Sequence, residues 1–143
     1  MGENIQSLTV AVPSRIKSTK NASYPLSGWR IAVKDIFLIE GIQTSVCNRT
    51  YYELYSPATK TAKCITLLQE KGACILGITK LAAFAVTEEL IECMDYQAPW
   101  NPRADGYQSP EGSSSGSGVS VASYKWVDIA IGPDSEFRWP FSY

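Results

Sequence analysis

The stretch Trp29-Arg30-Ile31-Ala32-Val33-Lys34-Asp35 is a short run of β-prone residues that ends in two charged ones. After it, the apolar residues of 57–71 fall near helical spacing, with basic side chains on the other side. Gly72 lies where a helix C-cap belongs, and residues 74–78 have the composition of a buried strand. A strand, a helix and a strand at this spacing predict a βαβ unit and an α/β fold.

The rest of the chain divides around this unit. Residues 1–27 are polar and predict an extended lead-in, which leaves 28–143 as the folded domain. Within that domain we expect a second short helix over 81–94 and a loop over 95–112, where several prolines and an Asp-Gly pair break regular structure. Small and apolar residues then predict a helix from Val119 to Tyr124 and a strand from Val127 to Ile131.

Composition narrows the function classes. Hydrophobic residues make up 45% of the chain and charged residues 19%, which is typical of a globular protein. The net charge of −1 gives no cationic excess for a nucleic-acid or anionic-membrane partner. The apolar stretches are too short for a membrane span, and no secretory signal opens the chain, so we expect a cytosolic protein with reduced thiols.

Histidine is absent from the chain, and this excludes a Ser-His-Asp triad, a Cys-His pair and any metal site built on histidine. None of the four cysteines forms a C-x-x-C pair, so a zinc knuckle is not expected either. We therefore expect neither a metal nor a cofactor. Proton transfer near neutral pH would have to use lysine, cysteine, tyrosine or a carboxylate with a shifted pKa.

A serine-rich segment, Gly112-Ser113-Ser114-Ser115-Gly116-Ser117-Gly118, admits more than one interpretation. Glycine and serine are the usual components of flexible linkers. A glycine-rich turn before a helix can also hold a phosphate, although the Lys-Ser/Thr ending of a P-loop is missing here. The apolar helix and strand expected directly afterwards favour a structured role, but this segment alone leaves the choice open.

Lys34 is the second candidate. Most lysines at strand ends are solvated surface charges. A lysine held in an apolar pocket behaves differently, because desolvation disfavours its charged form and leaves the amine available as a base.

Taken in order, several motifs resemble the amidase-signature family. They are Val33-Lys34-Asp35, then Gly72-Ala73 with Gly77-x-Thr79-Lys80, then Asn101-Pro102, and then the serine segment, residues 112–118. The match runs from about Gly28 to Pro140, and the stretch 95–110 is similar to a branch common in filamentous fungi. This resemblance implies the N-terminal part of a mixed central sheet flanked by helices, and hydrolysis of the C–N bond of a small-molecule amide.

The resemblance also implies roles for individual residues in a Ser–cis-Ser–Lys mechanism, one of the histidine-free variants of triad logic. Lys34 matches the buried, neutral lysine that acts as the base. Ser113 matches the serine that relays the proton, and the peptide bond before it would be cis. Gly112, Ser114 and Ser115 would shape the loop around them.

The nucleophile is where the chain departs from the pattern. The family has a Gly-Gly-Ser unit after the strand 127–132, whereas this chain reads Asp134-Ser135-Glu136-Phe137-Arg138. Ser135 aligns with the pattern's threonine and is kept as a secondary nucleophile candidate. A lysine usual in the family is also replaced by Ile78, which would weaken the surroundings of the site.

The sequence ends at Tyr143, soon after this segment, and we expect an incomplete domain that is inactive. Such a chain would pair with a partner that covers its open edge, be unstable, or derive from a broken or mis-spliced gene. Three functions follow: an inactive amidase by descent, a hydrolase that has recruited Ser135, and a non-catalytic binding or scaffold protein. Nucleotide binding through the serine segment ranks behind them.

Overall fold

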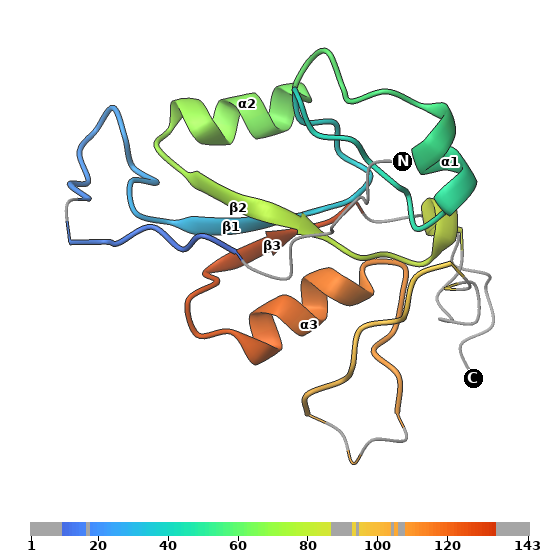
Figure 1. Ribbon diagram of the computed structural model, residues 1–143. Coiled ribbons are helices and arrows are strands. Elements are labelled where there is room, and N and C mark those ends of the chain that lie inside the picture. The colour runs from blue at the N-terminus through green and yellow to red at the C-terminus, as the bar shows by residue number, and fades with distance from the viewer. Residues whose placement is uncertain are drawn as a thin grey trace, which may run out of the picture.

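Three parallel strands form the centre of the computed structural model, in the order β2-β1-β3 (Figure 1). Their bounds are Arg30–Lys34 for β1, Cys74–Thr79 for β2 and Ile129–Ile131 for β3. The structure describes residues 10–16, 18–86, 93, 95–103, 105 and 108–133. Within this part, the parallel strands and the helices that flank them confirm the predicted α/β class.

Strand β1 lies between the other two and is buried along almost its whole length. A central parallel strand is covered on both faces, which is why its residues are apolar without alternation. Val33 is paired with Ile78 on one side and with Ile131 on the other. All three strands therefore end at the same edge of the sheet, with Lys34 in the middle.

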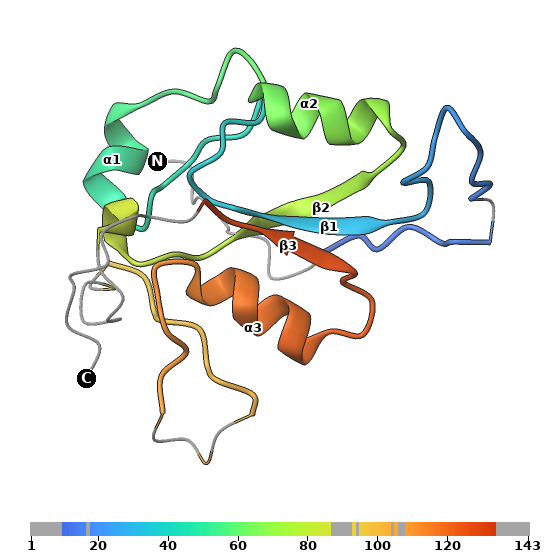
Figure 2. The ribbon, with the colours of Figure 1, turned by 180° about the vertical axis from the view of Figure 1, so that it is seen from behind.

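Helix α2, Lys63–Glu70, covers one face of the sheet, and helix α3, Ser115–Ser123, covers the other (Figures 1 and 2). Under α2, the core is built from Ile31 and Val33 of β1, Ile65 of α2, and Ala73, which precedes β2. Burying an aliphatic side chain of this size contributes about 1.5–3 kcal/mol. This packing fixes β1 in the centre of the fold.

The helix predicted over 57–71 is shorter in the structure. Its first residues are extended, because the Ala58 amide donates to the Ile42 carbonyl at 3.0 Å and the Ala62 amide to the Leu38 carbonyl at 2.8 Å. These bonds to the loop after β1 replace those of a first helical turn. Gly72 follows the helix with a φ of +91°, as expected for a residue in the C-cap region.

Two other helices differ from the sequence expectation. Helix α3 begins at Ser115 rather than at Val119, so residues 115–118 of the serine segment form the first turn of a packed helix, and the segment is not a linker. Helix α1, Arg49–Leu54, was not predicted, although Asn48 caps it by accepting a hydrogen bond from the Tyr51 amide at 2.8 Å. Of the second short helix expected over 81–94, the described residues hold a 3₁₀ turn, Ala83–Ala85, and residues 87–92 and 94 lie outside them.

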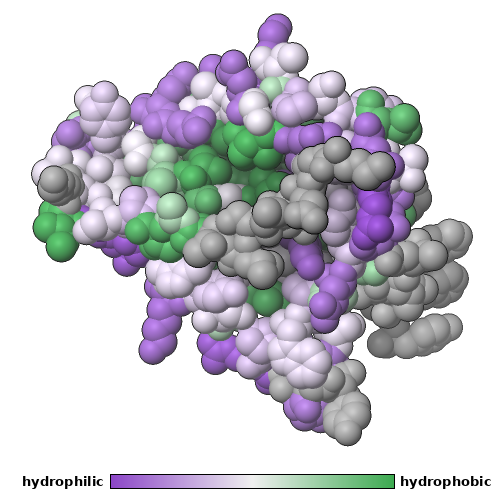
Figure 3. All heavy atoms as spheres, in the orientation of Figure 1, coloured by the Kyte–Doolittle hydropathy of each residue, from purple (hydrophilic) through white to green (hydrophobic). Residues whose placement is uncertain are grey.

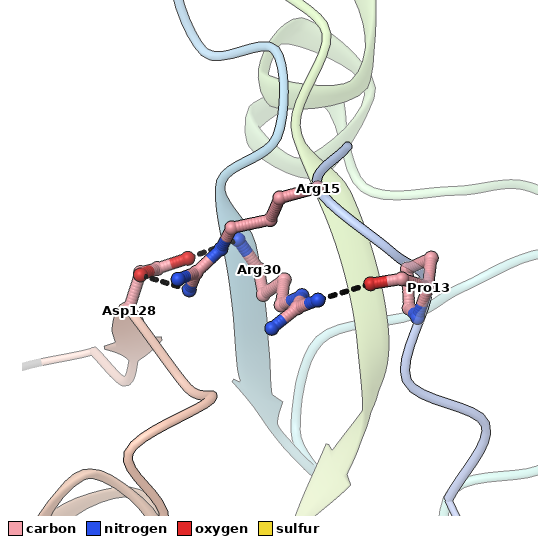
Figure 4. A network of polar contacts seen from close by, with 4 residues as sticks. All are labelled: Pro13, Arg15, Arg30 and Asp128. Carbon is pink, nitrogen blue, oxygen red and sulfur yellow. Dashed lines mark hydrogen bonds and ion pairs between the residues drawn. The ribbon is translucent and has the colours of Figure 1, made fainter. Parts of the chain in front are cut away.

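The N-terminal segment contacts the opposite end of the sheet from Lys34 (Figure 4). Asp128 accepts a hydrogen bond from the Arg30 amide at 2.8 Å and forms an ion pair with Arg15 at 2.5 Å, and the Arg30 guanidinium donates to the Pro13 carbonyl. These contacts connect the start of β1 to the residue before β3. Of the helices that the structure describes, none has the length and apolar character needed to span a bilayer.

Candidate active site

Lys34 is the last residue of the central strand, and its side chain is fully buried, with 0% exposure. Burial lowers the pKa of its amine below the ordinary lysine value, because the charged form loses its hydration. Lys34 forms no ion pair with a carboxylate of the described residues. The position therefore favours the neutral amine that a base requires.

The buried amine meets the serine segment. Lys34 Nζ lies 2.7 Å from Ser113 Oγ and 2.8 Å from Ser114 Oγ, and it donates to both hydroxyls. Ser113 is itself 6% exposed, and the Gly112–Ser113 peptide bond is cis. The structure thus brings together Lys34 and Ser113, which are far apart in the sequence. It adds Ser114, which sequence analysis had treated only as a residue that shapes the loop.

The serine segment is held in place through the residues that follow β2. The Ala82 amide donates to the Ser113 carbonyl at 3.0 Å, and the Gly116 amide donates to the Lys80 carbonyl at 2.9 Å. Between the hydroxyls of Thr79 and Ser117 there is a further hydrogen bond of 2.9 Å. The end of β2 therefore fixes the position of the segment over the end of β1.

Two glycines allow this close approach. A Cβ on Gly116 would lie 2.5 Å from the Lys80 backbone nitrogen, and a Cβ on Gly132 would lie 2.5 Å from Ser114 Oγ and 3.3 Å from Lys34 Cδ. Gly132 directly follows β3. All three strand ends therefore surround the contact between lysine and serine, in the way that parallel α/β sheets place their sites at the carboxyl ends of the strands.

The remaining candidates have different positions. Gly112 is half-buried and precedes the cis bond, whereas Ser115 is 1% exposed and, among the described residues, its Oγ has no hydrogen-bond partner. Ser135, with the rest of 134–143, lies outside the described residues. The position of this nucleophile candidate relative to Ser113 therefore stays a prediction from the sequence.

A cleft of about 420 Å³ lies beside the candidate active site and is lined in part by Thr79 and Lys80, which also hold the serine segment. One side carries Asp35, whose Oδ2 accepts hydrogen bonds from the amide and hydroxyl of Ser45 at 2.9 and 2.6 Å. Burial is the main cause that raises the pKa of Tyr96 above its ordinary value. The lining residues are Asp35, Gln43, Ser45, Cys47, Tyr52, Ile78, Thr79, Lys80, Leu81 and Tyr96. The aromatic rings and short polar groups suit a small organic molecule.

Chemically, the arrangement can pass a proton between a buried amine and a hydroxyl. A lysine with a lowered pKa accepts a proton at a pH where an ordinary lysine is already charged. The residues present can therefore assist a hydroxyl nucleophile that lies within reach of Ser113. No group of three or more metal-ligating side chains occurs in the residues that the structure covers.

The fold and this site define an α/β protein with a buried lysine–serine contact at the carboxyl ends of its strands. The family model described as Amidase matches residues 6–136, most of the chain. The chain belongs to this family. The matched range begins within the segment 1–27 that the sequence predicts as a lead-in.

Individual relatives agree with the family. Over 130 residues the chain is 40% identical to "Amidase 1" of Arabidopsis thaliana, an alignment that covers 88% of this chain and 29% of that protein. It is 37% identical over 128 residues to a glutamyl-tRNA(Gln) amidotransferase subunit of Sulfurisphaera tokodaii, covering 87% of this chain and 26% of that one. The chain thus spans under a third of the length of these relatives.

A solved structure gives the same result for the fold. The corresponding glutamyl-tRNA(Gln) amidotransferase subunit from Thermotoga maritima matches with a TM-score of 0.67 at 26% identity, over 82% of this chain and 26% of that one. The described sheet and helices are therefore similar to one part of a larger amidase-family structure.

Proposed function

We propose that this chain is an amidase by descent, in which Lys34 and Ser113 form the base and the relay of a Ser–cis-Ser–Lys mechanism for hydrolysing a carboxylic amide. Lys34 takes the proton of the Ser113 hydroxyl, and Ser113 takes that of a nucleophilic serine as it attacks the amide carbonyl. The amine then leaves with a proton returned through the same groups, and water releases the acid.

The observation that carries this proposal is the distance of 2.7 Å between Lys34 Nζ and Ser113 Oγ in a buried position. A solvated strand-end lysine would have water as its partner and an ordinary pKa. The enclosed amine with a lowered pKa instead suits a base that works near neutral pH. Membership of the amidase family is consistent with this chemistry.

We also propose that the chain by itself does not turn over substrate, because the Gly-Gly-Ser unit is missing between Asp134 and Arg138. Two glycines at that point would let the backbone approach a reacting carbonyl closely. Glu136 and Phe137 stand there instead, and a carboxylate opposes the negative charge that develops on the oxyanion. Ser135 is the remaining hydroxyl candidate.

Two direct assays test inactivity. The purified chain is incubated with small aliphatic and aromatic amides while ammonia release is measured, and it is also treated with a fluorophosphonate probe. We expect no turnover and no labelled serine. Labelling of Ser135 that is lost in Ser135→Ala would overturn this expectation and favour the recruited nucleophile.

The roles of Lys34 and Ser113 need an active context. A chimera would join residues 28–133 of this chain to the remaining sequence of the Arabidopsis relative, which supplies its own nucleophile segment. In the chimera, Lys34→Met and Ser113→Ala should each lower kcat by at least about 10²-fold, as expected for loss of general acid–base catalysis. The exposed positions Lys60→Met and Ser123→Ala are matched controls and should leave kcat unchanged. Equal activity of test and control variants would refute the assigned roles.

A second candidate is a non-catalytic scaffold whose partner covers the outer strands. Figure 3 shows apolar side chains gathered in the middle of one face, and Leu67 and Ile78 are 46% and 40% exposed. Within the described residues β2 and β3 are the outer strands, and such edges can pair with another chain. Size-exclusion chromatography with light scattering would support this candidate by showing a stable heteromer and argue against it by showing a soluble monomer.

Two finer assignments belong to the same proposal. We place the chain in the fungal branch of the family, on the stretch 95–110, and in the cytosol. A phylogenetic tree of amidase sequences would test the first, and fractionation of cells that express a tagged chain would test the second.

A further inference from the structure

Ser114 occupies the position from which a serine side chain usually caps a helix. It is the N-cap residue of α3, where serine is favoured because its hydroxyl can accept a hydrogen bond from an amide of the first turn. The Ser114 side chain makes no such bond. Its oxygen instead accepts a hydrogen bond from Lys34 Nζ at 2.8 Å. The helix therefore begins without the stabilisation that this serine could give it, and the hydroxyl contacts the buried amine.

The residue after β3 limits where this hydroxyl can point. A Cβ on Gly132 would lie 2.5 Å from Ser114 Oγ and 3.1 Å from Ser114 Cβ, so the Gly132 backbone packs closely against the serine side chain. The Ser114 carbonyl is held as well, because it accepts hydrogen bonds from the amides of Ser117 and Gly118 at 3.0 and 3.1 Å. Both the backbone and the side chain of Ser114 are thus held in place beside Lys34.

The direction of the lysine lone pair decides whether the amine can act as a base. A neutral amine has two N–H groups and one lone pair, and rotation about its last carbon–nitrogen bond exchanges their positions. To accept a proton, Lys34 must point the lone pair at the Ser113 hydroxyl, 2.7 Å away. An acceptor for one N–H group on another side of the nitrogen favours this rotation, and Ser114 Oγ is such an acceptor.

We propose that Ser114 is a positioning residue, which accepts one N–H group of the neutral Lys34 amine and so directs the lone pair at Ser113. The inference rests on the proposed function, because it concerns the same proton transfer. Ser114 neither gains nor loses a proton in it: Lys34 takes the proton of Ser113, and Ser113 takes that of the nucleophile. The resulting ammonium then donates to both serine oxygens, as the two distances allow.

The contact can be tested in the chain itself, without turnover. In protein labelled with ¹³C-lysine, the Cε resonance of each lysine follows the pKa of its amine, and Lys34→Met identifies the signal of Lys34. An accepting hydroxyl stabilises the charged amine more than the neutral one, so Ser114→Ala should lower the pKa of Lys34 further. Ser114→Thr keeps the hydroxyl and should restore the pKa. Ser123→Ala, at the exposed end of α3, is the matched control and should leave it unchanged.

The effect on catalysis is measured in the chimera that carries residues 28–133 of this chain. Ser114→Ala should lower kcat about 10-fold and leave KM unchanged, because the amine remains but its lone pair is no longer held in one direction. This loss is smaller than the decrease of at least about 10²-fold expected for Lys34→Met and Ser113→Ala. Ser114→Thr should retain most of kcat.

The outcomes separate this inference from the proposed function. An unchanged pKa of Lys34 in Ser114→Ala would overturn the inference, and so would an unchanged kcat in a chimera that Lys34→Met and Ser113→Ala impair. A loss of kcat as large as that of Ser113→Ala would place Ser114 in the proton path itself and overturn the positioning role. If neither Lys34→Met nor Ser113→Ala lowers kcat, the proposed function fails and this inference fails with it.

Discussion

Replacing Gly116 by alanine places a methyl group against the backbone of Lys80. The new Cβ would lie 2.5 Å from the Lys80 nitrogen, 2.6 Å from its oxygen and 3.0 Å from its Cα. Carbon contacts are comfortable at about 3.5–4.0 Å, so α3 must move away from the end of β2 by roughly 1 Å. Overpacking of this kind costs about 1–3 kcal/mol, since backbone atoms cannot rotate out of the way.

Gly118, two residues further along the same helix, is the matched control, because a Cβ there meets nothing within 4 Å. Both substitutions gain the helix propensity of alanine, about 0.5–1 kcal/mol, so the difference between the variants isolates the steric cost. We expect Gly118→Ala to be neutral or stabilising, and Gly116→Ala to unfold about 1–3 kcal/mol more easily than Gly118→Ala.

Urea denaturation followed by tryptophan fluorescence measures this difference, with Trp126 just after α3 as a reporter. At an m-value of about 1–3 kcal/mol per M, the midpoints should separate by roughly 1 M urea. The displaced helix should also loosen the contact of Lys34 with Ser113 and raise the pKa of Lys34 towards its ordinary value. Equal midpoints for the two variants would refute the close packing of α3 on β2.

Three further predictions rest on single contacts. Burial lowers the pKa of Lys34, so the unfolded chain binds the proton of its amine more tightly than the folded chain does. Folding should therefore become more favourable as the pH rises towards 10.5. Lys34→Met should remove this rise in the free energy of unfolding, measured by urea titrations across that pH range. Asn48→Ala removes the cap from the Tyr51 amide and should lower the free energy of unfolding by about 1 kcal/mol, with Asn48→Ser retaining most of it. Asp128→Ala leaves the Arg30 amide without its carboxylate partner at an exposed position and should cost about 0.5–1.5 kcal/mol, measured as a shift of the thermal midpoint.

The strands and the helix end at the centre of the fold could be predicted from the sequence, because each of them follows from a local pattern of residues. The apolar run before Lys34 and the strand over 74–78 could be assigned from composition, and Gly72 marked the helix end between them. The proximity of Lys34 and Ser113 was expected only through the resemblance to a family, since residues this far apart in the sequence carry no local signal of contact.

Features that depend on packing between segments were missed. The residues ahead of Lys63 are not helical because the amides of Ala58 and Ala62 donate hydrogen bonds to the loop after β1. Helix propensities of single residues do not predict such bonds to a distant segment. The early start of α3 at Ser115 needs the close approach of Gly116 to Lys80, which sequence cannot show.

The burial of the Lys34 amine has a consequence for the rate at which its hydrogens exchange with those of water. Lys34 Nζ is shut off from bulk water and touches the hydroxyls of Ser113 and Ser114. We expect hydrogen exchange at this nitrogen to require that these contacts open first, because the amine is otherwise closed to water. Isotope exchange at this one lysine would then measure how often they open.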